Sequence, residues 1–285
     1  MRSMQTPILD EVRRPTATEG NGMQLALSPS RAADYKNCPL LYRFRSIDRL
    51  PEPPSAVATK GTLVHAVLDE VFNAPANLRS PAAAVALVQP AWQTLCEEKP
   101  ELEQLFASDT EAAEWLSSAK ALVMGYFELE DPQRLEPEAR EIFLEVELDD
   151  TLKLRGYVDR LDVTPAGEIR VVDYKTGAVP SEAFEAKALF QLKFYALMIW
   201  KTRGVVPKQL RLVYLRSKQV LDYAPSEQEL LNCERLLRSL ARAITAAKQS
   251  GKFLPRPGRL CSWCPHQQLC PAHGGTPPPY PYDLV

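Results

Sequence analysis

The chain has 285 residues, of which 45% are hydrophobic and 25% charged, and this composition excludes a fibrous or globally disordered protein. No apolar run approaches the roughly 20 residues of a membrane span, and the N-terminus lacks the apolar core of a secretory signal, so we expect a cytoplasmic protein without a membrane partner. The net charge of −2 excludes attraction of nucleic acid over the whole surface, so contact with DNA would need local basic patches.

The N-terminal part combines a segment without periodicity and a helix that a proline interrupts. We interpret residues 1–24, which carry Pro, Thr, Arg and Glu, as a mobile arm. Ser28 is expected to cap a helix that Pro29 begins, and Pro39 breaks it directly after Cys38. A dense basic run crosses this region, as a solvated face or a phosphate-tracking surface: Arg31, Lys36, Arg43, Arg45 and Arg49.

An amphipathic helix is predicted over Lys60–Phe72. His65 and Asp69 lie one turn apart on it, although a lone helical histidine is more often a packed or surface residue than a ligand. The next stretch, about residues 75–135, is Ala- and Leu-rich with helical periodicity, so we interpret it as a helical insertion without chemistry of its own. Its tryptophans are expected in the core rather than in base stacking: Trp92 and Trp115.

Two strands then precede the central part of the chain, Glu141–Leu148 and Leu152–Leu161, joined by an Asp-Asp turn. This turn would place Glu145 opposite Arg155 and Glu147 opposite Lys153. Such pairs usually only stabilise the strands, although one of the two glutamates is a weak candidate for a carboxylate near a metal.

A β-hairpin follows, in which two β-rich runs flank a Thr-Pro-Ala-Gly turn: Tyr157–Val163 and Glu168–Tyr174. If the turn centres on Ala166, Asp159 faces Asp173 with their Cβ atoms roughly 5 Å apart. Lys175 follows Asp173 by two residues and therefore joins the carboxylates on one face.

Two opposed carboxylates repel each other unless a positive group lies between them, and a divalent cation removes the conflict. Hard, oxygen-preferring Mg²⁺ or Mn²⁺ would bind these carboxylates together with waters and phosphate oxygens, which leaves Lys175 to hold a water. The arrangement indicates phosphodiester hydrolysis. The alternative is a surface hairpin whose Asp and Lys side chains only solvate one face, and spacing alone leaves it open.

The C-terminal half is predicted to contain a helix over Glu182–Lys201, which places Gln191 and Tyr195 one turn apart. Strands at Gln209–Leu215 and Val220–Tyr223 follow. Their vicinity offers three basic side chains to a backbone phosphate: Arg211, Arg216 and Lys218. A long amphipathic helix ends the fold, with a serine cap and a glycine stop: Ser226–Ser250 and Gly251.

Three thiols near the C-terminus have the spacing C-x2-C-x5-C in a Pro-rich loop: Cys261, Cys264 and Cys270. Disulfides are not expected in a cytoplasmic protein, so this pattern indicates a metal site. A closed site needs four ligands, and Cys38 is the best fourth candidate because it also precedes a proline in a broken helix. Zinc or an iron–sulfur cluster fits the spacing, with His266 or His273 as substitute zinc ligands. Cys96 and Cys233 fall in helical stretches and are interpreted as core residues.

Four short motifs occur in one order along the chain, with one cysteine ahead of them and three behind. They are Gly61-Thr-Leu-Val-His65, Gly156-x-x-Asp159, Asp173-Tyr-Lys175-Thr-Gly177 and Gln191-x-x-x-Tyr195. From about Ser28 to Cys270 the chain therefore resembles the RecB-like PD-(D/E)XK nucleases. The cysteines resemble those of the iron–sulfur members, including the AddB nuclease domain and the CRISPR-associated adaptation nucleases. Val158 stands where the superfamily name has Pro, and Asp173 where it has Glu, as is common in RecB-type members.

The resemblance implies a role for each site residue. The ligands of one or two Mg²⁺ or Mn²⁺ ions would be His65, Asp159, Asp173 and the backbone carbonyl of Tyr174. Lys175 would orient the attacking water, while Gln191 and Tyr195 would position the phosphate or the strand end. A [4Fe-4S] cluster, with zinc as its rival, would be held by Cys38, Cys261, Cys264 and Cys270.

We therefore expect an α/β fold with a restriction-endonuclease-like PD-(D/E)XK core, in which helices flank a mixed central sheet. The expected parts are the arm 1–24, a nuclease domain 25–270 with the insertion 75–135, an iron–sulfur subdomain from 28–45 and 255–270, and a Pro-rich tail 271–285.

The implied function is a Mg²⁺- or Mn²⁺-dependent exodeoxyribonuclease that acts on single-stranded or end-resected DNA in repair or recombination. The chain has no G-x-x-x-x-G-K-[ST] phosphate loop, so any motor would be a separate helicase. The alternative is a non-catalytic DNA-binding or scaffolding subunit with a structural iron–sulfur or zinc site. The intact set of candidate catalytic residues argues against that alternative: His65, Asp159, Asp173 and Lys175.

Overall fold

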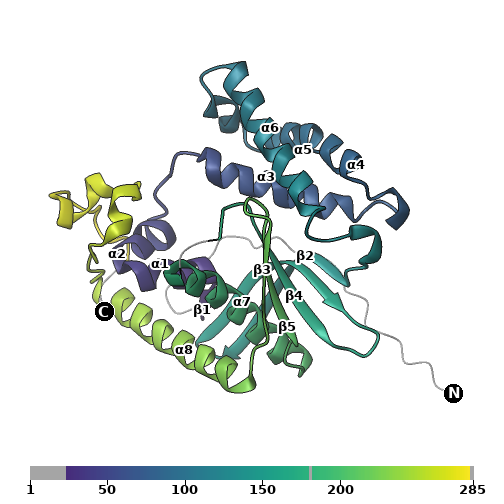
Figure 1. The fold of residues 1–285 in the computed structure, drawn as a ribbon. Coiled ribbons are helices and arrows are strands. Elements are labelled where there is room, and N and C mark those ends of the chain that lie inside the picture. The colour runs from purple at the N-terminus through teal and green to yellow at the C-terminus, as the bar shows by residue number, and fades with distance from the viewer. Residues whose placement is uncertain (1–23, 180–181, 283–285) are drawn as a thin grey trace.

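A mixed six-stranded sheet forms the centre of the structure, a computed structural model that describes residues 24–179 and 182–282 (Figure 1). The strand order is β1-β3-β4-β5-β6, and β2 also pairs with β3. The strands are β1 (Leu25–Leu27), β2 (Ala139–Asp149), β3 (Leu152–Val163), β4 (Ile169–Lys175), β5 (Gln209–Tyr214) and β6 (Gln219–Tyr223). β1 pairs parallel with β3, and β4 with β5, whereas the other pairs are antiparallel. The predicted α/β fold with a mixed central sheet is confirmed.

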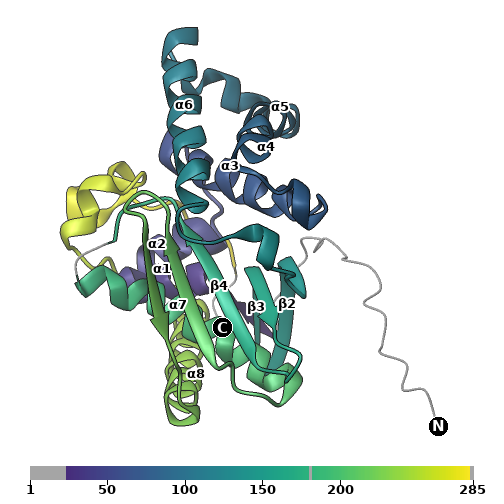
Figure 2. The ribbon, with the colours of Figure 1, turned by 45° about the vertical axis from the view of Figure 1, so that its right-hand side comes forward.

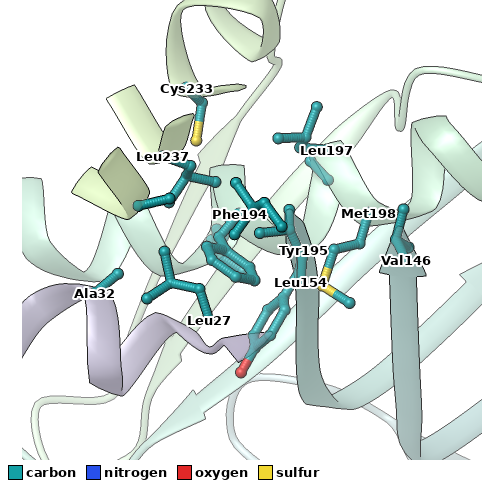
Figure 3. Close-up of a cluster of buried hydrophobic side chains, with 14 of the residues drawn as sticks. Leu27, Ala32, Val146, Leu154, Phe194, Tyr195, Leu197, Met198, Cys233 and Leu237 are labelled. Carbon is teal, nitrogen blue, oxygen red and sulfur yellow. The ribbon is translucent and has the colours of Figure 1, made fainter. Parts of the chain in front are cut away.

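Three helices pack together on one face of the sheet (Figure 1). α7 (Glu182–Arg203) contacts the strands, α8 (Glu227–Ser250) packs along α7, and α1 (Pro29–Asn37) contacts both helices. The core between them is apolar, and Figure 3 shows Leu154 of β3 beside Phe194 of α7 within it. α7 is therefore fixed against the sheet, which matters because it carries two of the candidate site residues.

The opposite face carries α3 (Ala56–Val71) and the helices of the predicted insertion, which lie above the sheet in Figure 2. They are α4 (Pro81–Ala86), α5 (Val88–Glu98) and α6 (Asp109–Tyr126). Trp115 is buried and donates its indole N–H to the Ala56 carbonyl at 3.0 Å, and the half-buried Trp92 packs against it at 5.0 Å between ring centroids. Both tryptophans contribute to a second apolar core, as expected.

Short helical turns connect these elements. They are α2 (Pro39–Tyr42), the π-helical turn Arg43–Ile47, and the 3₁₀ turns Ala76–Leu78, Pro100–Leu105, Pro132–Arg134, Arg259–Trp263, Gln267–Leu269 and Pro271–His273. Except for Gln24, the predicted N-terminal arm lies outside the described residues. Among the described helices, none is both long and apolar enough to cross a membrane.

Most helix ends lie where the sequence predicts them. Ser28 Oγ accepts a hydrogen bond from the backbone of α1, Cys38 separates α1 from α2, and Gly251 ends α8 with a left-handed φ of 66°. α3 differs, because it begins four residues before the predicted Lys60. Ser55 caps it there by accepting from the Ala58 N–H at 3.4 Å.

A buried arginine joins the helical insertion to the sheet. Arg160 of β3 is 0% exposed, and its guanidinium donates to both carboxylate oxygens of Glu130 at 2.7 and 3.0 Å. It also donates to the Tyr174 hydroxyl at 2.5 Å, and Arg211 of β5 donates to the same Glu130 carboxylate at 3.0 Å. Removing one partner of such a pair would leave a buried charge uncompensated, which is strongly destabilising. The network therefore connects the helical insertion firmly to the sheet.

Several basic side chains that the sequence offered to phosphate are engaged elsewhere. Arg43 is buried and pairs with Asp48 at 3.0 Å, while Arg45 pairs with two carboxylates at 2.8 and 2.7 Å. Arg211 pairs with Glu130 and Asp222. Local protein carboxylates therefore already compensate the charge of these three arginines, and their role toward phosphate stays a prediction.

Candidate metal and catalytic site

The sheet has an opening at the centre of β3. β2 follows one edge of β3 from Leu152 to Leu161, so β1 and β4 must share the other edge. In the described part of the chain, β1 pairs there with residues 152–154 and β4 with residues 160–163, so the strand ladder is interrupted between these two ranges on this edge. Gly156 lies in the opening, and a Cβ atom added to it would meet the Tyr195 ring at 2.9 Å. Glycine is needed at this position because α7 brings an aromatic side chain against the backbone.

The hairpin register is the one that the sequence predicts. Arg160 pairs with Val172, Gly167 adopts a left-handed φ of 81° in the turn, and the pairing would continue to Asp159 and Asp173. At that point a side-chain hydrogen bond takes the place of backbone pairing between β3 and β4. Asp159 Oδ2 accepts it from the Tyr174 N–H at 2.7 Å.

Asp173 and Lys175 share a face, as expected, and both face α7. Lys175 Nζ lies 2.5 Å from Asp173 Oδ2 and donates to Gln191 Oε1 at 3.0 Å. Gln191 Nε2 in turn donates to the Tyr195 hydroxyl at 3.2 Å. The structure therefore brings four of the predicted site residues into one connected row.

Asp173 is the most buried acid of the site, with 2% of its surface exposed. Burial raises its pKa to about 6, even though the Lys175 ammonium acts in the opposite direction, and the nearby Asp159 raises it further. Its Oδ2 has the ion-pair contact with Lys175 but no directional hydrogen bond. A buried carboxylate oxygen with this incomplete coordination is a suitable ligand for a hard cation.

His65 of α3 reaches the same point from the opposite face of the sheet. Its Nε2 lies 2.9 Å from the Tyr174 carbonyl oxygen, and its Nδ1 lies 3.5 Å from Asp159 Oδ2. Burial alone would lower the pKa of His65, but hydrogen bonds to Asp159 and Glu141 raise it to about 10. Without a bound ion, protonated His65 supplies positive charge beside the carboxylates, whereas as a ligand it would be neutral and the cation would supply that charge.

Glu141 completes this group, although the sequence analysis favoured other glutamates. Its Oε1 lies 3.7 Å from His65 Nδ1, and one ligand atom each from His65, Glu141 and Asp159 lie within 4.8 Å of one another. Glu145 instead pairs with Lys153 at 3.0 Å. The strand register that pairs Glu145 with Arg155 also places Glu141 opposite Asp159. Counting residues along the predicted register would therefore have identified Glu141.

The backbone is irregular at this point. Glu141 has a left-handed φ of 41°, which is uncommon for a residue with a side chain. Val158 packs in the core under α7, whereas Arg160, two residues further on, contacts Tyr126 and Tyr174 of the other core. The normal alternation of β3 is therefore interrupted at Asp159, and this interruption turns its carboxylate toward His65.

The donor set fits a divalent cation. Carboxylate oxygens from β2 and β3 lie within 4.8 Å of the His65 imidazole, the Tyr174 carbonyl contacts the same imidazole, and this is ligand chemistry that Mg²⁺ and Mn²⁺ accept. Asp173 is not in this group of three, although its charge acts on the same site. Asp173 Oδ2 would gain from such an ion the coordination that the protein alone does not complete.

The four predicted cluster cysteines lie around a separate cavity. Helix α2, which follows Cys38, and the C-terminal turns lie side by side in both ribbon views (Figures 1 and 2). Arg256 donates its backbone N–H to Cys38 Sγ at 3.3 Å. A cavity of about 240 Å³ is lined by Cys38, Cys261, Cys264 and Cys270. His273 also lines it, whereas His266 is buried and bonded to Glu52 at 2.8 Å. Cys233 is a buried helix residue, as predicted, and Cys96 is half-buried.

Comparison with known proteins places this arrangement in a family. The chain belongs to the PD-(D/E)XK nuclease superfamily, whose family model matches residues 26–271. It is 29% identical over 270 residues to the Gene 69 protein of Mycobacterium phage D29, covering 86% of this chain and 96% of that protein. It is 26% identical over 289 residues to the Gene 69 protein of Mycobacterium phage L5, covering 86% and 95%.

A solved structure described as "Crystal structure of SSO0001" is also similar. It is 15% identical, has a TM-score of 0.41, and the match covers 90% of this chain and 89% of that one.

Proposed function

We propose that this protein is a Mg²⁺- or Mn²⁺-dependent nuclease that hydrolyses phosphodiester bonds of DNA. The ion would be held by His65, Asp159, Asp173 and the Tyr174 carbonyl, with Glu141 beside them. The observation that carries the proposal is the group of His65, Glu141 and Asp159, whose ligand atoms lie within 4.8 Å of one another, beside the buried Asp173 carboxylate that pairs with Lys175 at 2.5 Å.

The bound ion and the protein side chains would have different roles in hydrolysis. A bound divalent ion supplies Lewis-acid stabilisation of charge on the phosphate. Burial would lower the pKa of Lys175, but the Asp173 carboxylate raises it above its ordinary value, so Lys175 stays an ammonium. It therefore orients the attacking water by donating hydrogen bonds and does not remove its proton. Gln191 and Tyr195 form the adjoining polar row and would position the phosphate or the end of the strand.

Digestion of end-labelled linear DNA with Mg²⁺ or Mn²⁺ tests the proposal. Lys175→Ala should reduce the rate about 100-fold or more, since it removes the group that positions the nucleophile beside the developing charge. Lys193→Ala is a matched control, because Lys193 is also a partly buried, ion-paired lysine but pairs with Glu229 at 2.9 Å, outside the proposed catalytic set. Equal digestion by wild type and Lys175→Ala would refute the role of Lys175.

We further propose that cleavage starts from DNA ends and serves repair or recombination, beside a separate helicase. The resemblance to RecB-like nucleases supports this part. Comparison of linear DNA with covalently closed circles tests it, because an exonuclease leaves circles intact. DNA binding without metal-dependent digestion of any substrate would favour the alternative, a non-catalytic subunit.

We propose a [4Fe-4S] cluster for the cysteine cavity, as a structural clamp between the two ends of the domain. Among the described residues, no three of the four thiols lie within 4.8 Å of one another. A tetrahedral zinc site with Zn–S bonds of about 2.3 Å would need sulfurs about 3.8 Å apart. The cavity also far exceeds the roughly 10–15 Å³ that one water needs. Both observations support a multi-atom cluster. Protein purified anaerobically should be brown and contain iron and sulfide, whereas a colourless zinc protein would overturn this assignment.

A further inference from the structure

Two aromatic side chains lie directly beside the candidate metal site on the open face of β2 and β3. Phe143 and Tyr157 are paired across the strands, and their ring centroids are 5.1 Å apart. Glu141 and Asp159 each lie two residues away on the same two strands. Tyr157 is 47% exposed, so its ring is available to a ligand.

A cross-strand aromatic pair contributes about 0.2–1 kcal/mol to a sheet, and this would be a sufficient explanation if the pair faced only bulk solvent. Phe143 and Tyr157, however, line a groove of about 680 Å³. Phe190, Gln191 and Tyr195 of α7 line the same groove. The groove therefore joins an exposed aromatic surface to Gln191 and Tyr195, and Gln191 in turn accepts a hydrogen bond from Lys175.

Charge does not explain what the groove would bind. Two arginines line it, Arg45 and Arg155, but Arg45 is paired with Asp34 and Glu52, Asp34 lines the groove as well, and the whole chain has a net charge of −2. A ligand that combines flat apolar rings with phosphate fits this arrangement, since the rings can stack on the aromatic pair while the phosphate lies at the candidate cation site, two residues further along the same strands.

We propose that this groove binds single-stranded DNA, with one base stacked on the Phe143–Tyr157 pair next to the phosphate at the metal site. The inference rests on the proposed nuclease function. A base within a duplex is stacked and paired, so its face is not available, whereas an unpaired base offers it. Stacking on aromatic rings is tolerant of sequence because every base has a π-face. The groove would thus prefer single-stranded to double-stranded DNA and would not distinguish base sequences.

Binding of a fluorescently labelled oligothymidylate, measured by anisotropy with the full chain in a chelator, tests this without cleavage. Tyr157→Ala should raise Kd roughly 5- to 150-fold, the effect of losing one stacked base, while Tyr157→Phe should stay within about 2-fold of wild type. Melting temperatures of the variants should be nearly unchanged, because Tyr157 is exposed.

A scan with single abasic sites locates the stacked base. One abasic position should weaken binding to wild type but not to Tyr157→Ala, because the two changes remove the same contact. Equal binding by wild type and Tyr157→Ala, equal weakness of Tyr157→Ala and Tyr157→Phe, or additive losses at every abasic position would each overturn the inference.

The failure of this inference and the failure of the proposed function are distinguishable. If wild type digests DNA with Mn²⁺ but the aromatic variants bind and digest like wild type, the stacking groove is wrong and the nuclease remains. If base-dependent binding is present but no metal-dependent digestion occurs, the groove is supported and the catalytic proposal fails.

Discussion

The carboxylate site and the cysteine cavity differ in what holds their ligand groups in place. The carboxylates come from paired strands, and His65 and Lys175 lie 3.5 and 2.5 Å from Asp159 and Asp173. The cysteines come from opposite ends of the domain, on short turns, and they have only isolated backbone N–H contacts such as those to Cys38 and Cys261. The first site is built on strands of one sheet. The second lies between the two ends of the domain, which are also joined by contacts such as His266–Glu52 at 2.8 Å and Phe44–His266 at 5.3 Å between ring centroids. Losing a ligand group should therefore have opposite consequences for stability at the two sites.

Cys38→Ser should have the largest effect on stability. If a cluster joins Cys38 to the C-terminal turns, its loss removes binding energy that is also folding energy, and we expect the melting temperature to fall by about 10 °C or more. Calorimetry and limited proteolysis measure this, with the C-terminal turns cut first. Cys96→Ser is the matched control, because Cys96 is equally half-buried but belongs to α5. Similar melting temperatures for both variants would show that no bound group bridges the two ends.

The sequence predicted the carboxylate site better than the surroundings that hold it. The Asp159–Asp173 register followed from the turn chemistry of Pro165 and Gly167, which is local. The partners of Arg211 did not follow, because Glu130 lies 81 residues away and only the packing of α6 brings it near.

The position of His65 relative to the hairpin was likewise not deducible from local pattern. It depends on α3 crossing the sheet, 109 residues before the Tyr174 carbonyl that it contacts. For His65 only the resemblance to a family carried the information. Contacts between remote segments are set by tertiary packing, which residue spacing does not encode.

Asp173→Asn should stabilise the metal-free protein while it abolishes cleavage. The folded-state pKa of Asp173, about 6, lies above the ordinary value of 3.8, so the neutral form is favoured by the fold. The stability that this shift provides is present below pH 3.8 and is lost as the pH rises through 6. Asparagine stays neutral throughout, so the variant should gain nothing near pH 4 and about 1–3 kcal/mol at pH 8.

Urea unfolding at both pH values, in a chelator, measures this difference. Adding Mn²⁺ should reduce or reverse the advantage, because only wild type retains the anionic ligand and gains stability from the ion. A variant that is less stable than wild type at pH 8 in the chelator would show that Asp173 is held mainly by its ion pair with Lys175.

Glu141→Gln should have the smallest effect, on metal affinity alone. We expect about 10-fold weaker Mn²⁺ binding by calorimetric titration, since Glu141 contacts His65 at 3.7 Å and lies within reach of the same ion. Glu145→Gln, on the same strand but paired with Lys153, should bind Mn²⁺ like wild type.

Glu141→Gly distinguishes the effect of the Glu141 carboxylate on metal binding from the effect of its backbone conformation on stability. A non-glycine residue with a φ of 41° costs of order 1–3 kcal/mol, and glycine removes that cost. This variant should therefore be more stable than wild type and yet bind Mn²⁺ as weakly as Glu141→Gln. If it loses stability instead, the left-handed backbone of Glu141 is not strained. The backbone conformation would then give no support to a functional role for the Glu141 carboxylate.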